Sequence, residues 1–337
     1  MINVAVIGAG HWGPNLSRTL DNKKRSRVVW LIDNNPERRE QMRGRYPDSS
    51  IGARPEAAFE DERVEAVVIA TPTATHFELA RAALKAGKHV LVEKPIAATV
   101  AEGEELCRLA AEAGLVLMVG HIFIYNLAVR FVKCCIDEGR IGQPQLISMT
   151  RTNLGPIRTD VNAAWDLMPH DLSMLRYWLG ADPDRVTAFG GSWANSGVQD
   201  MVQVGLIYPG GVIATIRATW LDPAKDREVR VIGTDRMLTF DDMNATEPVR
   251  IHDKGLEQSG AVSDSFAEFR SSTRDGDIIS PKVATGEPLA QECEHFLDCI
   301  EQGQTPETSG SDGVAVVRVL EAITRSLQNN SQLEEVT

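Results

Sequence analysis

Two side chains that can exchange protons stand one helical turn apart in the stretch WDLMPHDLSML, residues 165–175. Asp166 and His170 are four positions apart, which places them on one face of a helix. Pro169 is accepted in a first helical turn but not deep inside a helix, so we expect the helix to begin near Asp166. A helix amino terminus stabilises a carboxylate and disfavours imidazolium, so His170 is expected to be neutral and able to accept a proton. A capping pair without any chemical role is the alternative.

A second candidate site follows the first apolar run, INVAVI, where the chain reads GAGHWG. Gly8, Gly10 and Gly13 have the spacing G-x-G-x-x-G between a predicted strand and a predicted helix. The first glycine permits a tight turn, the second lets the backbone approach a pyrophosphate, and the third lets the helix pack on the strand. His11 and Trp12 lie in the same turn and are expected to shape its wall. Chance turn glycines are the alternative.

Asp33 stands twenty residues after the third glycine, at the end of the predicted strand 27–33. A carboxylate at this place accepts the ribose hydroxyls of NAD and repels the additional phosphate of NADP. NAD is therefore the expected cofactor, and NADP is less favoured. Arg38 and Arg39 could offset the repulsion if they turned back toward Asp33, but a solvated helix face is the expected arrangement for both.

Polar residues also follow two later apolar runs of the first part of the chain. One run ends in ATPTATH and the other in EKP. Because the carboxyl ends of parallel strands meet at one crevice, these residues are expected to line the cofactor site. Pro95 favours an extended conformation of the preceding residue, and the bond between them is a candidate for a cis peptide. The candidate cofactor-binding residues of these runs are Thr71, Pro72, His76, Glu93 and Lys94.

The segment TRTNLGPIRTDVNAAWD, residues 150–166, is rich in groups that could bind an oxygen-rich ligand. A guanidinium group suits a phosphate or a carboxylate because it donates two parallel hydrogen bonds. Arg151, Arg158 and Asn162 are therefore candidate substrate-binding residues. For each of them an ordinary polar loop is the alternative.

The elements that position these residues alternate between strand and helix in the first 120 residues, which predicts a doubly wound parallel sheet in an NAD-binding domain, 1–120. Beyond it, alternation within 200–220, with a turn at Pro209-Gly210-Gly211, predicts a hairpin with one buried face. We therefore expect a second domain, 121–337, of α+β class with a mostly antiparallel sheet, and the last two helices could pack back on the first domain. The strands expected in the first domain are 2–7, 27–33, 64–71, 88–94 and 115–120; in the second they are 142–153, 227–233 and 236–240, and 259–280 has the most loop-like composition.

Composition excludes several classes of protein. The 337 residues are 43% hydrophobic and 24% charged, which is typical of a globular protein of two domains. A formal net charge of −12 repels nucleic acid and anionic lipid. No window approaches the length of a membrane span, the first apolar run is too short for an export signal, and five cysteines without a C-x-x-C pair fit a reducing cytoplasm. No compact ligand spacing supports a metal site.

In combination, these motifs resemble the glucose-fructose oxidoreductase/inositol dehydrogenase/MocA (Gfo/Idh/MocA) family of NAD(P)-dependent sugar oxidoreductases. The resemblance runs along nearly the whole chain, through GAGHWG, ATPTATH, VEKP and the pair Asp166 and His170. It implies a Rossmann cofactor domain, a second domain with a large open sheet, and a catalytic group formed by Lys94, Asp166 and His170. It also implies that all three contact the substrate.

The chemistry of this family implies roles for the three side chains. Loss of hydride from a carbinol carbon must be accompanied by loss of the hydroxyl proton, so a base must lie within about 2.6–3.2 Å of that oxygen. His170 is the expected base, Lys94 the expected hydrogen-bond donor to the same oxygen, and Asp166 the group that orients one of them. The division of proton transfer between Lys94 and His170 stays open.

The segments 120–126 and 150–166, with Trp165, are similar to the branch that acts on nucleotide-diphosphate sugars such as UDP-N-acetylglucosamine or its uronate, at the 3-position. A free-sugar or inositol dehydrogenase is the nearest alternative, and the same chemistry can run in the reductive direction. Two alternatives from other classes are a regulatory protein that binds dinucleotide without catalysis and a structural oligomer. A homodimer or homotetramer formed through the open sheet is expected in every case.

Overall fold

The computed structural model describes residues 1–21, 24–194, 197–256 and 273–337. Its contacts form two compact units. Unit 1 combines Met1–Tyr125 with Glu287–Glu321, and unit 2 combines Asn126–Gly286 with Ala322–Thr337. The expected domain limits, 1–120 and 121–337, remain a prediction.

Unit 1 is built on a six-stranded sheet in which every pair of neighbouring strands is parallel, in the order β3-β2-β1-β4-β5-β6. The predicted doubly wound sheet is confirmed, and the order changes direction between β1 and β4, where such sheets bind ligands. β3 was not predicted, because three residues are too few to show an alternating pattern. The strands are β1 (Ile2–Ile7), β2 (Ser26–Ile32), β3 (Ser50–Gly52), β4 (Ala66–Ile69), β5 (His89–Glu93) and β6 (Leu117–Gly120).

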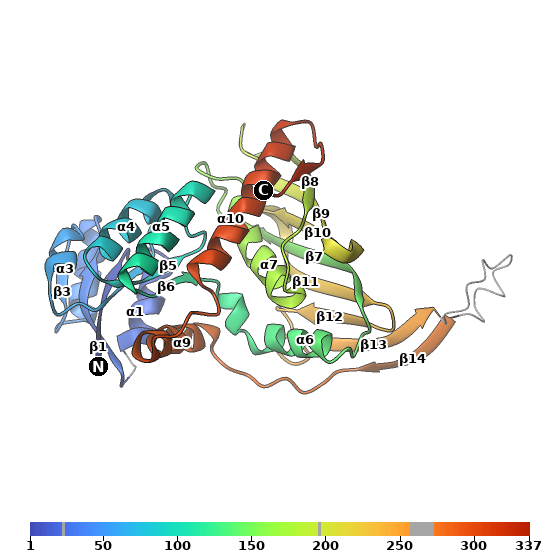
Figure 1. Ribbon diagram of the computed structural model, residues 1–337, viewed down its shortest axis with the longest axis horizontal. Helices are drawn as coiled ribbons and strands as arrows, with labels where there is room; N and C mark the ends of the chain where they lie inside the picture. The colour runs from blue at the N-terminus through green and yellow to red at the C-terminus, as the bar shows by residue number, and fades with distance from the viewer. Residues whose placement is uncertain (22–23, 195–196, 257–272) are drawn as a thin grey trace. The chain divides into compact units, whose positions relative to one another are not determined.

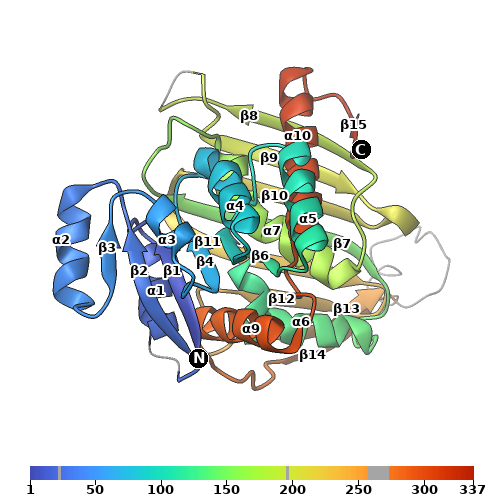
Figure 2. The same ribbon diagram turned by 60° about the vertical axis from the view of Figure 1, so that its left-hand side comes forward.

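The helices of unit 1 cover the sheet and begin at residues suited to helix starts. α4 and α5 lie side by side and contact β4, β5 and β6 (Figure 2). α1 contacts β1 and β2 and packs against α9. Asn35 caps α2 with its side chain and Thr99 forms a capping box with Glu102 at the start of α5. The helices are α1 (Gly13–Asp21), α2 (Pro36–Arg45), α3 (Glu56–Glu60), α4 (His76–Lys85), α5 (Val100–Ala113) and α9 (Pro288–Gln302), with 3₁₀ turns η1 (Thr73–Thr75) and η2 (Ile122–Tyr125).

Unit 2 contains a nine-stranded sheet in the order β14-β13-β12-β11-β7-β10-β9-β8-β15. Among the described residues, β7 and β10 are parallel and the other neighbouring pairs are antiparallel, which confirms a mostly antiparallel sheet. The predicted hairpin is formed by β9, the turn η3 (Pro209–Gly211) and β10. The strands are β7 (Pro144–Leu154), β8 (Arg185–Gly191), β9 (Met201–Ile207), β10 (Ile213–Thr219), β11 (Leu221–Gly233), β12 (Met237–Asp241), β13 (Val249–Leu256), β14 (Thr273–Ile279) and β15 (Glu334–Glu335).

One face of the unit 2 sheet is covered by α6 (Leu127–Asp137) and α7 (Ala163–Leu179), as Figure 1 shows. The covered face carries the predicted alternating residues, since Val202, Val204 and Leu206 of β9 are buried. Residues of the opposite parity on β7, β10 and β11 remain exposed: Leu146, Ile213 and Ile232. The boundary between the two units falls within α10 (Gly310–Gln328).

The start of α7 differs from the prediction. The helix begins at Ala163 rather than near Asp166, because the side chain of Asn162 accepts a hydrogen bond from the Trp165 amide and caps it. Pro169 consequently lies inside the helix, beyond the first turn.

The buried stripe expected on α7 and the loop expected at 259–280 both differ in part from the structure. Of the buried stripe expected on α7, Leu172 and Leu175 are buried, whereas Leu179 is half-buried and Trp178 is fully buried instead. Within 259–280, the part at Thr273–Ile279 is a strand paired with β13, so the loop prediction is wrong there, and 259–272 lies outside the described residues.

The five cysteines are free thiols, and no helix in the described ranges is long and apolar enough to cross a membrane.

Candidate active site

The glycine turn between β1 and α1 has little room for side chains at two of its three glycines. Gly8 has φ +98°, and a Cβ there would lie 2.4 Å from the carbonyl oxygen of Ala70. A Cβ at Gly13 would lie 1.8 Å from the carbonyl oxygen of Gly8. At Gly10 the nearest atom to such a Cβ is 3.9 Å away, so this glycine keeps its surface open. The backbone can therefore be approached closely at the middle glycine, as a dinucleotide turn requires.

Asp33 lies directly beside this turn and is almost completely buried. Its carboxylate accepts hydrogen bonds from the amides of Ala9, at 2.6 Å, and Asn35, at 2.8 Å. Arg38 approaches the same carboxylate at 3.6 Å. Arg39 donates to the carbonyl oxygen of Asp33 at 2.8 Å. The expected solvated face is therefore incorrect for Arg39, and Arg38, although half-exposed, also turns back toward Asp33.

A cavity of about 360 Å³ lies next to the glycine turn and α2. Arg38 and Arg45 contribute positive charge to it, and Tyr46 contributes an aromatic ring. Arg38, whose guanidinium lies 3.6 Å from the Asp33 carboxylate, is one of its lining residues. The residues lining it are Ala9, Pro14, Ser17, Arg38, Gln41, Met42, Arg45 and Tyr46.

His76 holds the ends of β4 and β5 together. Its ring nitrogens lie 2.8 Å from the carbonyl oxygens of Thr71 and Pro95, and the side chain is buried. Burial lowers the pKa of His76, and the hydrogen bonds to the two carbonyl oxygens oppose that shift. Both nitrogens face protein carbonyls, so the imidazole ties the Thr71-Pro72 loop to the segment after β5.

Lys94 and Pro95 are joined by a cis peptide bond, as the sequence suggested. The amide of Lys94 lies 3.3 Å from the Glu93 carboxylate, which packs against Gly120 at the end of β6. Burial raises the pKa of Glu93 to about 7. Lys94 thus follows a carboxyl group that is only partly ionised near neutral pH.

Two more buried titratable groups, Glu292 and His121, lie in unit 1. Burial, and to a lesser extent Glu93, raises the pKa of Glu292 on α9 well above its usual range. Burial lowers the pKa of His121 to about 4. Glu292 could have been recognised, since it shares the apolar face of α9 with Leu289, Cys293 and Phe296.

In unit 2, Asp166 accepts a hydrogen bond on each carboxylate oxygen. Arg158 donates to Oδ1 at 3.0 Å, and the indole of Trp220 donates to Oδ2 at 3.0 Å. Arg158 also pairs with Asp160, which is the main reason why its pKa is raised. His170 lies one turn after Asp166 on α7 and is half-buried. The structure therefore keeps the predicted pair on one helix face and fixes the carboxylate from two directions.

Two other candidate substrate residues are already engaged inside unit 2. Arg151 forms a bidentate ion pair with Asp171, with distances of 2.8 and 2.7 Å, and both side chains are buried. Asn162 uses its side-chain oxygen to cap α7. The fork of Arg151 consequently faces Asp171, and Arg158 is the candidate arginine that contacts Asp166.

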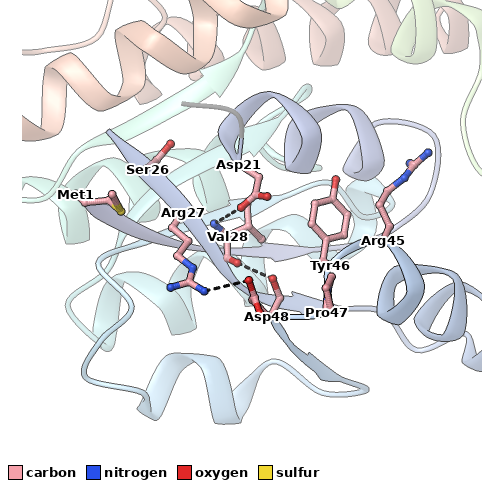
Figure 3. Close-up of a pocket in the computed structure, with 10 residues that line it drawn as sticks. Met1, Asp21, Ser26, Arg27, Val28, Arg45, Tyr46, Pro47 and Asp48 are labelled. Carbon is pink, nitrogen blue, oxygen red and sulfur yellow. Dashed lines mark hydrogen bonds and ion pairs between the residues drawn. The ribbon is translucent and has the colours of Figure 1, made fainter. Parts of the chain in front are cut away.

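A second cavity of unit 1, of about 330 Å³, shares Arg45 and Tyr46 with the first (Figure 3). It is lined by Met1 and by Ser26, Arg27 and Val28 at the amino end of β2, and Arg27 and Asp48 face each other across 3.6 Å. Parallel sheets bind dinucleotides at the opposite ends of their strands, so this cavity is not the cofactor site. Among the residues that the structure describes, no group of three or more His, Cys, Asp or Glu could hold a metal ion.

Family models match both parts of the chain. Residues 2–121 match "Oxidoreductase family, NAD-binding Rossmann fold", and residues 129–239 match "GFO/IDH/MocA C-terminal domain". The chain is similar to the UDP-N-acetylglucosamine 3-dehydrogenase of Acidithiobacillus ferrooxidans, with 30% identity over 95% of each chain. It is also similar to the myo-inositol 2-dehydrogenase of Thermotoga maritima, with 24% identity over 99% of each chain.

Solved structures show the same likeness over the whole fold. The A. ferrooxidans 3-dehydrogenase superimposes with a TM-score of 0.82 and 26% identity, over 98% of this chain and 99% of the other. GenD2 from gentamicin A biosynthesis, solved in complex with NAD, gives a TM-score of 0.83 and 25% identity, over 99% and 96%.

Proposed function

Because the chain belongs to the Gfo/Idh/MocA family and is an oxidoreductase with an NAD-binding Rossmann domain, we propose that it oxidises a carbinol of a nucleotide-diphosphate sugar. UDP-N-acetylglucosamine or its uronate, reacting at the 3-position, is the proposed substrate, and the reaction is reversible. The observation that carries the proposal is the Asp166 carboxylate, held on both oxygens one helical turn before His170.

The residues of unit 1 suit NAD. Gly10 leaves the turn open to a pyrophosphate, and the α1 amino terminus directs its amides toward that anion. Asp33 is positioned to accept the ribose hydroxyls with the lone pairs that Ala9 and Asn35 leave available. NAD supplies the hydride acceptor for the reaction. Thr71, Pro72, Glu93 and Lys94 are proposed to complete the cofactor-binding surface, with His76 holding its shape.

His170 is the proposed base that removes the hydroxyl proton as hydride leaves the carbinol carbon. His170 is the eighth residue of α7 and lies beyond its first turn, so the expected influence of the helix amino terminus on its charge does not apply. Lys94, as ammonium, donates a hydrogen bond to the same hydroxyl oxygen and stabilises developing negative charge. Asp166 stabilises the imidazolium that forms on His170. Arg158 is proposed to contact the substrate. Arg151, through its ion pair with Asp171, and Asn162, through its cap on α7, are proposed to hold that helix in place.

A free-sugar or inositol dehydrogenase is the second candidate, because the myo-inositol 2-dehydrogenase relative aligns over 99% of both chains. The retention of Lys94, Asp166 and His170 argues against a regulatory protein without catalysis. The exposed row formed by Leu146, Ile213 and Ile232 supports a homo-oligomer built through the open sheet face. Sedimentation of the purified protein would measure the subunit number, and a monomer would contradict this part of the proposal.

The deciding experiment is a screen of sugar nucleotides, free sugars and inositols with NAD, in which absorbance of the reduced cofactor is followed. We expect activity with a UDP-hexosamine or its uronate. His170→Ala should lower kcat by about 10²–10⁴-fold while NAD affinity stays within about twofold. Activity with unphosphorylated polyols alone would favour the second candidate, and full turnover by the His170 variant would refute the assigned base.

A further inference from the structure

Trp220 lies at the junction of β10 and β11, and its side chain is 1% exposed. The indole N–H donates to Oδ2 of Asp166 at 3.0 Å, across 54 positions of sequence. A buried tryptophan normally directs its single N–H to a partner, because an unsatisfied donor is costly. Here that partner is a carboxylate beside the proposed base.

The backbone around Trp220 is held from two sides. Its amide donates to the carbonyl oxygen of Asp200 at 3.0 Å, and its own carbonyl accepts from the amide of Gly155 at 3.3 Å. The hydroxyl of the preceding residue, Thr219, donates to the same Asp200 carbonyl. Trp220 therefore bonds to three parts of unit 2: the residue before β9, the loop that follows β7, and helix α7. Its ring has little freedom to turn away from Asp166.

The side chain of Asp200 is also held in place by hydrogen bonds. It is fully buried, and its Oδ2 accepts from the amides of Trp193, at 2.8 Å, and Ala194, at 2.7 Å. Because Asp200 directly precedes β9, its anchored backbone holds Trp220 at the carboxyl end of β10. The backbone of Trp220 is thus held by Asp200 before β9 and by Gly155 at the start of the loop that carries Arg158.

The two donors to Asp166 differ in rigidity. Arg158 has a long side chain that is about one third exposed, and it is shared with Asp160. Trp220 has only two side-chain torsions and is enclosed by protein. The indole N–H carries no charge, so it fixes the direction of one carboxylate oxygen without neutralising the anion.

We propose that Trp220 is a positioning residue for the reaction, which holds the Asp166 carboxylate in the orientation that stabilises the proton-carrying partner in the transition state. This inference rests on the proposed function. It requires Asp166 to act as a fixed anion rather than as the proton acceptor, since both of its oxygens already accept hydrogen bonds in the structure.

Trp220→Phe tests the proposal, with Trp178→Phe as a matched control. Trp178 is also 1% exposed and donates its indole N–H at 3.0 Å, but its acceptor is the backbone carbonyl of Val129 on α6 and not a proposed catalytic residue. We expect Trp220→Phe to lower kcat by about 10–100-fold, with KM and NAD affinity changed less than about threefold. The control should keep kcat within about threefold even if its melting temperature falls.

A double-mutant cycle with Asp166→Ala separates this inference from the proposed function. If Trp220 acts through Asp166, then Trp220→Phe causes no further loss of kcat in the Asp166→Ala background. Full activity of Asp166→Ala would overturn the proposed role of Asp166 itself. An impaired Asp166→Ala protein together with a Trp220→Phe protein that behaves like the Trp178 control would overturn only the positioning role.

Should Trp220→Phe fail to fold, 3-benzothienylalanine introduced at position 220 provides a closer replacement, because sulfur takes the place of the N–H in a ring of nearly the same shape. The same 10–100-fold loss of kcat is expected from this protein. Wild-type kcat in the folded analogue would overturn the proposal.

Discussion

Arg151 on β7 and Asp171 on α7 form a bidentate ion pair whose side chains are 5% and 2% exposed. The pair connects the strand that precedes the Arg158 loop to the helix that carries Asp166 and His170. Removing one partner of such a pair leaves the other charge buried, and the cost exceeds that of losing an exposed pair.

Asp171→Asn should therefore lower the free energy of unfolding by about 3–5 kcal/mol, measured by urea denaturation. The control is Glu247→Gln, which breaks an Arg250–Glu247 pair in which both side chains are nearly half exposed. This control should change stability by less than about 1 kcal/mol. Equal effects of the two variants would show that burial does not increase the contribution of the Arg151–Asp171 pair to the free energy of unfolding.

Gly13→Ala should abolish measurable NAD binding or prevent folding, because the added Cβ would lie 1.8 Å from the Gly8 carbonyl oxygen. Gly44→Ala in α2 is the control, since no atom lies within 4 Å of its Cβ position. That variant should be as stable as wild type or more stable by up to about 1 kcal/mol. Calorimetric titration measures NAD binding by both variants, and urea denaturation measures their stability. Normal NAD binding by Gly13→Ala would rule out the proposed close packing.

Asp33→Asn should weaken NAD binding by about tenfold and strengthen NADP binding. The substitution removes the negative charge that repels the additional phosphate and frees Arg38, 3.6 Å away, to approach that phosphate. Asp48→Asn is the control, because Asp48 lies at the amino end of β2 opposite Arg27 (Figure 3). Dissociation constants for the two cofactors decide the matter; an unchanged ratio in Asp33→Asn would contradict this role.

The pH dependence of stability should report on Glu292. Burial raises the pKa of this carboxyl well above its ordinary value of 4.5, so the folded protein binds its proton more tightly than the unfolded chain does. Its contribution to stability is fully present below the unfolded pKa and is lost as the pH rises toward the folded pKa. Wild-type stability should accordingly fall through this group as the pH rises above the ordinary carboxyl pKa of 4.5.

Glu292→Gln removes that titration, so its gain in unfolding free energy over wild type should grow with pH. Glu294→Gln on the same helix is the control, because Glu294 is partly exposed and pairs with Arg25. Urea denaturation at several pH values measures both variants. A pH-independent difference between Glu292→Gln and wild type would count against a proton held on Glu292.

Local signals in the sequence were sufficient for the cofactor half of the protein. The strand, G-x-G-x-x-G turn and helix are encoded within residues 2–21, and Asp33 follows at the end of the next strand. Close backbone contacts require glycine at Gly8 and Gly13, so the glycine pattern is visible without the fold. The pair Asp166 and His170 was likewise found from its i, i+4 spacing, although the cap at Asn162 moved the helix start to Ala163.

The sequence by itself determined most of the elements, though not, for example, β3 or β14, and which side chains can do chemistry, because periodicity, turns and helix spacing depend on residues close together in the chain. Only the tertiary structure decided which of those side chains are engaged elsewhere. Asp171 takes the fork of Arg151, Trp220 donates to Asp166, and α9 buries Glu292. Partners separated by tens of residues meet only when strands and helices pack, so neither the partner nor its effect on charge is written in any single segment.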